Sequence, residues 1–397
     1  MKVYTSKKET TSKKVIVVDD MILTTDMPTT AGSKMLDGFM SLIESEALVR
    51  LKNAGYEVGG KANVGEFNFD VIGESSYFGA IVNDGKLESA TAKIISDEEA
   101  IGALTLDVNG TIRRATAQSG LVSVKPTYGT VSRFGTIPVA CSGETVSVLS
   151  KTTDTCREML TAISGHDDKD GTSLSNELCA KINDYNKAKK VAVLTSMLSG
   201  IDGEVNKKID ETISILTKNG VEVEKIDNSI IPLSNIAWNV LMSAELCNNV
   251  SRYDGVKFGY RAENFLGIDE LYTKSRTEAF GELLKTAIIF GSETLSTENY
   301  FKVYDKCLRT RRVIVEEFKK IFDSYDAVIM PATSTLTYLE SAVKEDKTLC
   351  YKENFYTAPS SITGLPAVVV NGVQLVGEAF SDLKLLDLAS VIEKEGK

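Results

Sequence analysis

The chain has 397 residues, of which 43% are hydrophobic and 25% charged, as in a globular protein with one large domain or two. Lysine and arginine total 45 and aspartate and glutamate total 55, and the resulting charge of −10 disfavours direct binding to nucleic-acid phosphates. No apolar run approaches the roughly 18 residues that a membrane span needs.

Residues 1–14 are polar and lack the apolar core of a signal peptide, so we expect an N-terminal tail followed by a single domain over residues 15–397. Six cysteines are scattered without a Cys-x-x-Cys pair, which suits reduced thiols and predicts a cytoplasmic protein without a zinc site. The only histidine, His166, lies in a polar segment and excludes sites that need two histidines. We therefore expect no metal and no cofactor.

Short β-branched runs alternate along the chain with segments of helical periodicity. The expected strands are, in order, 14–18, 56–58, 191–194, 221–226, 327–330 and 367–370. The expected helices are 41–54, 202–219, 238–250, 270–295 and 301–322. This alternation predicts an α/β fold with a mixed, mostly parallel central sheet covered by helices on both faces.

The first strand ends in Asp19-Asp20, which suggests two kinds of site. With Lys125 and Pro126 further on, the acidic pair is typical of a phospho-accepting receiver domain, in which the two carboxylates hold magnesium. That site needs a third aspartate at the end of an intervening strand, and residues 56–70 do not offer one. The receiver-domain interpretation therefore has the weaker support.

A longer series of segments supports the second interpretation. The segments are 30–39 (TAGSKMLDGF), 60–67 (GKANVGEF), 107–113 (DVNGTIR), 120–138 (GLVSVKPTYGTVSRFGTIP), 162–172 (AISGHDDKDGT), 251–262 (SRYDGVKFGYRA), 273–281 (TKSRTEAFG) and 364–366 (GLP). Together they resemble the amidase signature family, and within it the A subunits of tRNA-dependent glutamyl/aspartyl amidotransferases. The resemblance implies the amidase-signature fold from about residue 15 onward. It also implies B- and C-type partner subunits.

Family amidases cleave an amide with a serine nucleophile, a relay serine and a lysine base, beside a glycine-rich oxyanion turn. The resemblance places Thr111 at the nucleophile position, after a turn that contains Asn109 and Gly110, and places Asp19 where the lysine should stand. The glycine-rich relay motif is missing, and we do not assign the relay role to Ser89. A carboxylate with an ordinary pKa near 4 is a poor base for a hydroxyl, so residues 107–111 are expected to form a plain Asn-Gly turn.

The resemblance also places three residues around a substrate. Arg276 occupies the position that holds a carboxylate, Tyr253 or Phe258 lies near the substrate, and Asn354 replaces an aspartate that pairs with an ammonium group. Arg276 is equally compatible with a structural role on a helix surface.

Three hypotheses follow. The first is a catalytically inactive amidase-fold protein that acts as a scaffold or binding module beside amidotransferase B/C-type subunits or by self-association. The second is a divergent amidase in which Thr111 attacks a small amide, with Asp19, Asp20 or a group supplied by another molecule as base. The third is a sensor that holds a small carboxylate through Arg276.

Overall fold

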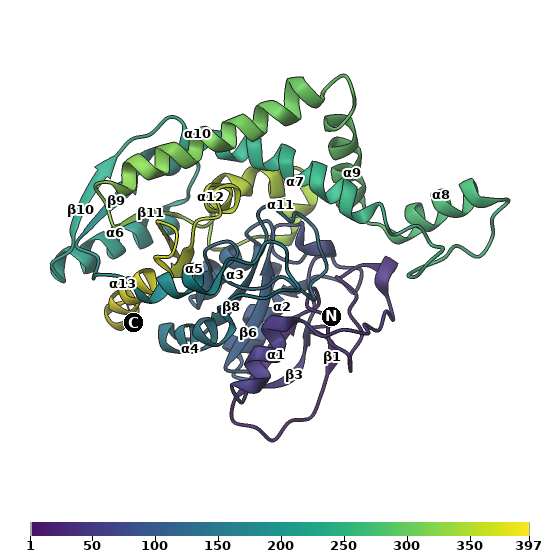
Figure 1. Ribbon diagram of the computed structural model, residues 1–397, viewed down its shortest axis with the longest axis horizontal. Helices are drawn as coiled ribbons and strands as arrows, with labels where there is room; N and C mark the ends of the chain where they lie inside the picture. The colour runs from purple at the N-terminus through teal and green to yellow at the C-terminus, as the bar shows by residue number, and fades with distance from the viewer. Residues whose placement is uncertain (1, 397) are drawn as a thin grey trace.

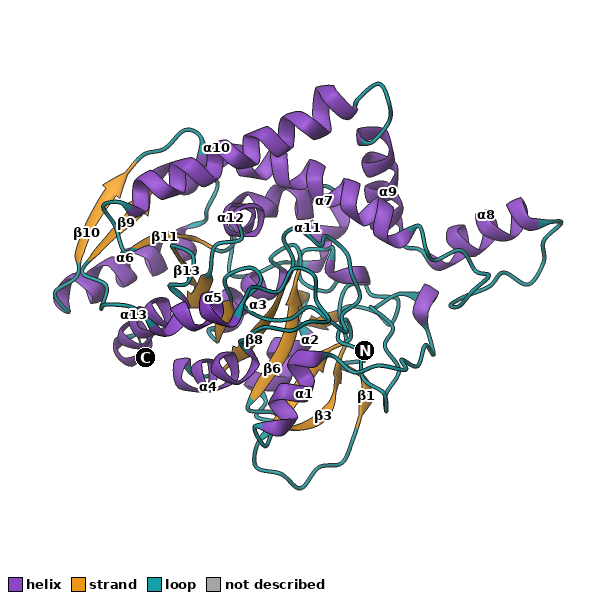
Figure 2. Ribbon diagram, viewed as in Figure 1, coloured by secondary structure: helices purple, strands orange, loops and turns teal. Residues whose placement is uncertain are grey.

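The computed structural model describes residues 2–396 (Figures 1 and 2). Its strands are β1 Tyr4–Lys7, β2 Val15–Asp19, β3 Glu57–Ala62, β4 Ile81–Asn83, β5 Lys86–Glu88, β6 Gly102–Asp107, β7 Val122–Lys125, β8 Thr145–Ser150, β9 Lys190–Leu194, β10 Glu222–Ile226, β11 Ala327–Pro331, β12 Ala367–Val370 and β13 Val373–Gly377. Its α-helices are α1 Glu46–Asn53, α2 Ala90–Ser96, α3 Thr111–Ser119, α4 Thr153–Ile163, α5 Asn176–Ala180, α6 Gly203–Lys218, α7 Ser234–Val250, α8 Ile268–Ala279, α9 Glu282–Thr294, α10 Asp305–Phe322, α11 Glu340–Glu345, α12 Leu349–Thr363 and α13 Asp382–Glu395.

Eleven of these strands form one sheet in the order β1-β3-β2-β6-β8-β7-β12-β13-β11-β9-β10. The mixed sheet that the sequence predicts is confirmed, but the expectation that it is mostly parallel is wrong. Parallel pairs occur only toward its two ends, at β3-β2-β6 and at β11-β9-β10, and every pair between them is antiparallel. One cause is the tight Asn371-Gly372 turn, which folds β13 directly back onto β12.

Helices cover both faces of the sheet. As a result, every residue of β6, β8 and β11 is buried. Helices α4 and α13 pack on β8 and β12, while α2 and α3 pack on β2 and β6. Helices α7, α9, α10 and α12 pack on one another as a further layer, and α8 projects from the body of the molecule (Figure 1). In residues 2–396, no helix is long and apolar enough to cross a membrane.

The N-terminal segment differs from the expected tail. Residues Tyr4–Lys7 form the edge strand β1, which pairs antiparallel with β3, and Lys8 N donates a hydrogen bond to Gly59 O at 2.8 Å. Strand β1 therefore extends the sheet that the rest of the chain builds.

The expected helix over 270–295 is also two helices. The chain turns at Phe280-Gly281, between α8 and α9, where Phe280 has the extended angles φ −95° and ψ 138°. We call this turn the elbow.

Candidate active site

Asp19 and Thr111 come together because β2 and β6 are neighbouring parallel strands. Asp19 is the last residue of β2, and the turn that follows β6 leads directly into α3, which begins at Thr111. The carboxyl ends of parallel strands meet at one edge of a sheet, and both side chains line one small cavity there. The two positions that the resemblance pairs therefore lie beside one cavity, and their catalytic role stays a prediction.

Glycine is required in that turn at residue 110. Its backbone has φ +79°, and a Cβ at this position would lie 2.4 Å from Cβ of Thr357 on α12. The close approach of α12 therefore fixes the shape of the turn that presents Thr111.

The Thr111 hydroxyl donates to backbone carbonyl oxygens. Its Oγ1 lies 3.1 Å from Asp70 O and 3.5 Å from Asn68 O. Within residues 2–396, no lysine or histidine side chain lines its cavity. A threonine hydroxyl needs a general base to become a nucleophile. Here the Thr111 hydroxyl donates its proton to the carbonyl oxygen of Asp70 instead.

Asp19 is buried, and its environment differs from the one the sequence suggests. The Thr91 hydroxyl, in the first turn of α2, donates to Asp19 Oδ1 at 2.6 Å, and Asn68 Nδ2 lies 3.5 Å from Oδ2. Burial raises the pKa of Asp19 to about 7, against the opposing effect of these hydrogen bonds. The expectation of an ordinary pKa near 4 is therefore wrong.

Ser89, to which we do not assign the relay role, has a structural function. Ser89 caps α2, accepting a hydrogen bond from Ala92 N at 3.4 Å. Thr91, two residues further on, is the hydroxyl that contacts Asp19. Sequence reasoning missed Thr91, because nothing in its neighbours shows that the first turn of α2 faces the end of β2.

One buried amine lies near this edge of the sheet. Lys61 Nζ donates to Ile22 O at 2.9 Å and to Thr29 Oγ1, and it lies 3.6 Å from Asp20 Oδ1. Burial lowers the pKa of Lys61 to about 8. Its side chain does not line the Thr111 cavity, so it does not replace the missing lysine.

Asn109 anchors the turn. Its side chain is fully buried, donates to Phe69 O at 3.2 Å and accepts from Trp238 Nε1 at 3.2 Å. Its amide therefore connects α7 to residues 66–70 and is not turned toward a ligand.

Residues 65–75 form a loop that lies over Thr111, and we call it the strap. The Arg114 guanidinium on α3 holds the strap in place by donating to Asp70 O at 3.0 Å and to Val71 O at 2.8 Å. Phe67 and Asn68 adopt left-handed backbone angles, with φ 54° and 52°. These conformations are costly for residues other than glycine, so the surrounding hydrogen bonds must hold the strap in place.

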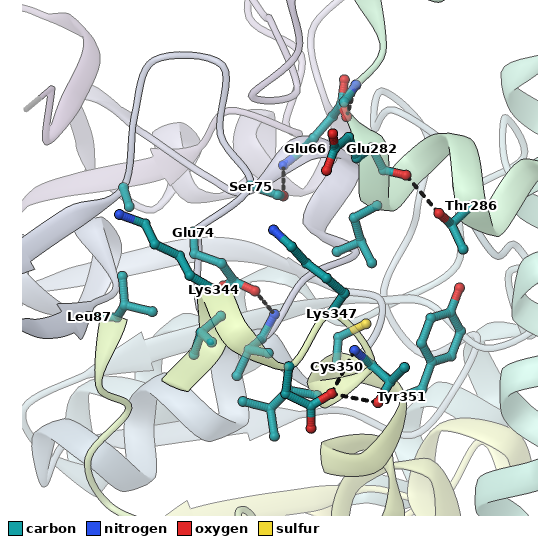
Figure 3. A pocket seen from close by; sticks show the side chains of 18 of the residues that line it. Glu66, Glu74, Ser75, Leu87, Glu282, Thr286, Lys344, Lys347, Cys350 and Tyr351 are labelled. Atoms are coloured by element: carbon teal, nitrogen blue, oxygen red, sulfur yellow. Dashed lines mark hydrogen bonds between the residues drawn. The ribbon is translucent and has the colours of Figure 1, made fainter. Parts of the chain in front are cut away.

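The strap separates two cavities. The cavity at Asp19 and Thr111 has a volume of about 20 Å³, enough for one water molecule. On the other side lies a cavity of about 470 Å³ (Figure 3), whose lining includes Glu66 and Glu74 of the strap and Cys350 of α12. A ligand-sized space therefore exists, but neither Asp19 nor Thr111 lines it.

Two strap carboxyl groups border the larger cavity. Glu74 accepts hydrogen bonds from the backbone of Val71 and Ile72, at 3.0 and 2.9 Å, while Glu66 accepts from Ser33 Oγ at 2.6 Å and Gly281 N at 2.8 Å. Burial raises the pKa of each carboxyl to about 7. Both carboxyl groups therefore brace the loop.

The three predicted substrate residues do not line the Thr111 cavity. Arg276 Nη1 donates to Val250 O at 2.9 Å and Tyr253 O at 3.0 Å, which closes the end of α7. Tyr253 is buried against Phe67, with ring centroids 5.5 Å apart, and burial raises its pKa to about 12. Asn354 is fully buried, with its side-chain amide packed against those of Asn239 and Asn109. All three side chains therefore have structural partners within the fold, and their roles at a substrate stay predictions.

Residues 2–396 contain no cluster of three histidine, cysteine or acidic side chains that could hold a metal ion.

Comparison with known proteins places these features in a family. The Amidase family model matches residues 15–386. The chain is 32% identical to the A subunit of glutamyl-tRNA(Gln) amidotransferase from Lachnoclostridium phytofermentans and 33% identical to its counterpart from Coxiella burnetii. Each alignment covers 95% of this chain and 82% of the relative.

Comparison with solved structures gives the same family resemblance. The crystal structure of the A subunit of glutamyl-tRNA(Gln) amidotransferase from Thermotoga maritima superposes with a TM-score of 0.82 at 28% identity, over 99% of this chain and 87% of that one. Allophanate hydrolase of Kluyveromyces lactis, at 20% identity, shares the fold with a TM-score of 0.78 over 96% and 63% of the two chains.

Proposed function

This chain belongs to the amidase family, and within it we propose a protein that no longer hydrolyses amides and acts as a scaffold or binding module. The observation that carries the proposal is the bonding of Thr111. Its hydroxyl donates to Asp70 O in a cavity of about 20 Å³, which, among the described residues, has no lysine or histidine in its lining and no space for an amide substrate.

The partners follow from the relatives. Proteins similar over 95% of this chain are A subunits of an amidotransferase, so B- and C-type subunits are the proposed partners, with self-association as the other arrangement. All six cysteines are free thiols, which is typical of a reducing compartment, so the proposal includes a cytoplasmic location.

An ammonia assay tests the loss of catalysis. Purified protein is incubated with glutamine, asparagine and simple amides, and released ammonia is measured beside a Thr111→Ala variant. We expect both proteins to match the blank. Ammonia release that disappears in Thr111→Ala would contradict the proposal.

A second candidate, a divergent amidase, is favoured by one observation. Asp19 has a pKa raised to about 7, contacts the Thr91 hydroxyl and lines the same cavity as Thr111. If the strap moved aside, deprotonated Asp19 could accept the proton of Thr111 through Thr91 as Thr111 attacks the amide carbon. This candidate predicts turnover that rises with pH through about 7 and is lost in Asp19→Asn; a Thr111→Ala variant with unchanged turnover would eliminate it.

A further inference from the structure

The elbow between α8 and α9 is a fixed feature of the fold. Glu66 Oε2 accepts a hydrogen bond from Gly281 N at 2.8 Å, and a Cβ on Gly281 would lie 2.8 Å from the same oxygen. The Arg276 guanidinium carbon lies 5.0 Å from the centroid of the Phe280 ring at the bend. The angle between the two helices is therefore set by contacts on both sides of the turn.

Inside the elbow the two helices enclose a groove of about 330 Å³. It is lined by two threonines and by Tyr272, Arg276, Phe280, Lys285, Ile288 and Ile289. Ile289 is 70% exposed and Tyr272 39% exposed. Apolar side chains this exposed in a preformed groove are typical of a binding surface.

The groove is positively charged in an acidic protein. Both of its cations are hydrogen-bonded to backbone carbonyls: Arg276 to Val250 and Tyr253, and Lys285 to Thr277 O at 3.3 Å. No carboxylate among residues 2–396 lines the groove; from outside it, the field of Asp254 acts on Arg276 and that of Glu66 acts on Lys285. In a chain with a net charge of −10, this local excess of positive charge selects an anionic occupant.

We propose that the elbow groove docks an acidic amphipathic segment of a partner protein. Apolar side chains of the segment would pack on Tyr272, Ile288 and Ile289, while its carboxylates would face Arg276 and Lys285. The proposal rests on the scaffold function proposed above and gives that scaffold a specific docking surface.

The test uses a defined probe on the full-length chain. A fluorescein-labelled peptide carries leucine at every third or fourth position and glutamate elsewhere, and its matched counterpart carries lysine in place of glutamate. Binding is measured by fluorescence anisotropy at two salt concentrations. We expect the glutamate peptide to bind, more weakly at high salt, and the lysine peptide not to bind.

Two variants and two matched controls locate the binding site. Ile289→Glu and Lys285→Glu are each expected to weaken glutamate-peptide binding by about tenfold or more. Ile236→Glu, at a residue 65% exposed on α7, and Lys319→Glu, at an exposed residue of α10, are expected to leave it unchanged. Circular dichroism spectra of all four variants are compared with that of the unaltered protein to check that the variants are folded.

Several outcomes would overturn the proposal. These are equal binding of both peptides, no binding of the glutamate peptide, or no effect of Ile289→Glu. Complete displacement by free glutarate would assign the groove to a small carboxylate, and a dimer that Ile289→Glu dissociates would assign it to a second copy of the chain. The ammonia assay is independent, so failure of the docking proposal and residual amidase activity are distinguishable.

Discussion

Asp19 carries a carboxyl group that is almost completely removed from bulk solvent. Its position at the end of β2 is visible in the sequence, but its pKa is set by α2 and the strap, which come from other parts of the chain. Burial disfavours the charged form more strongly than two hydrogen bonds favour it. Residue type and spacing therefore predict where this group lies but not how it ionises.

The raised pKa of Asp19 makes a prediction about stability. The folded state holds the Asp19 proton more tightly than the unfolded chain does, so this group costs stability increasingly as the pH rises from about 4 to about 7. Asparagine cannot ionise and escapes this cost. We expect Asp19→Asn to raise the free energy of unfolding more at pH 8 than at pH 5, by on the order of 2 kcal/mol, as measured by urea denaturation.

The matched control is Asp323→Asn, at an exposed residue after α10, which should give the same small change at both pH values. An Asp19→Asn effect that does not depend on pH would show that the carboxyl is charged in the folded state.

Gly110 allows a second prediction at the scale of a single residue. Its positive φ and the Thr357 contact at 2.4 Å both oppose a side chain, whereas Gly55 has φ +87° with nothing within 4 Å of its would-be Cβ. We expect Gly110→Ala to lower the free energy of unfolding by about 2–4 kcal/mol and Gly55→Ala by about 1–2 kcal/mol. If urea denaturation gave equal losses of the free energy of unfolding for the two variants, α12 would have to shift at little cost to accommodate a Cβ at residue 110.

Among the elements, α3 is tied to the rest of the molecule through Arg113. This buried side chain pairs with Asp107 at 2.8 Å and donates to Ser360 of α12 at 2.7 Å and Gln374 of β13 at 2.9 Å. Segments more than 240 residues apart in the chain meet at this one guanidinium. The sequence shows the arginine after the turn but not these partners, because they belong to other helices and strands.

Removing that guanidinium leaves Asp107 buried without its counter-ion. We expect Arg113→Met to lower the free energy of unfolding by about 3–5 kcal/mol in urea denaturation. Arg309→Met, at a residue 71% exposed and paired with Asp305, should cost less than about 1 kcal/mol. Similar losses for the two variants would contradict the central role of Arg113.

The elbow shows why helix boundaries are harder to predict than helix positions. Residues 270–295 keep a helical pattern of apolar side chains on both sides of Phe280-Gly281, so the sequence alone favours one helix. The break depends on the Gly281 backbone bonding to Glu66, some 215 positions earlier. The sequence predicts strand 367–370 with its observed bounds, since four consecutive apolar residues between Gly-Leu-Pro and Asn-Gly leave little ambiguity.

At the scale of the whole molecule, one sheet joins the first and last strands of the chain. Strands β12 and β13 lie between β7 and β11, so the C-terminal hairpin links the N-terminal strands to β9 and β10. The expectation of a mostly parallel sheet is wrong for this reason: alternation of strands and helices does not reveal which strands become neighbours. The single domain predicted over residues 15–397 stays a prediction.

That arrangement predicts one cooperative unfolding transition. The only tryptophan, Trp238, is buried against the Asn109 turn and reports on the centre of the molecule. Its fluorescence and the far-UV circular dichroism signal should change together in urea, because no half of the sheet is complete without β12 and β13. Two separate midpoints would instead indicate two independently folding units.

The strap also limits whether the lysine base of the family could be accommodated at residue 19. Writing lysine back at residue 19 would send a long side chain into a space sized for one water molecule, against Thr91 and Asn68. We expect an Asp19→Lys variant to show no amide hydrolysis unless the backbone over Thr111 is rebuilt at the same time. On the proposal that hydrolysis has been lost, small steps suffice to lose it, whereas regaining it would require many simultaneous changes.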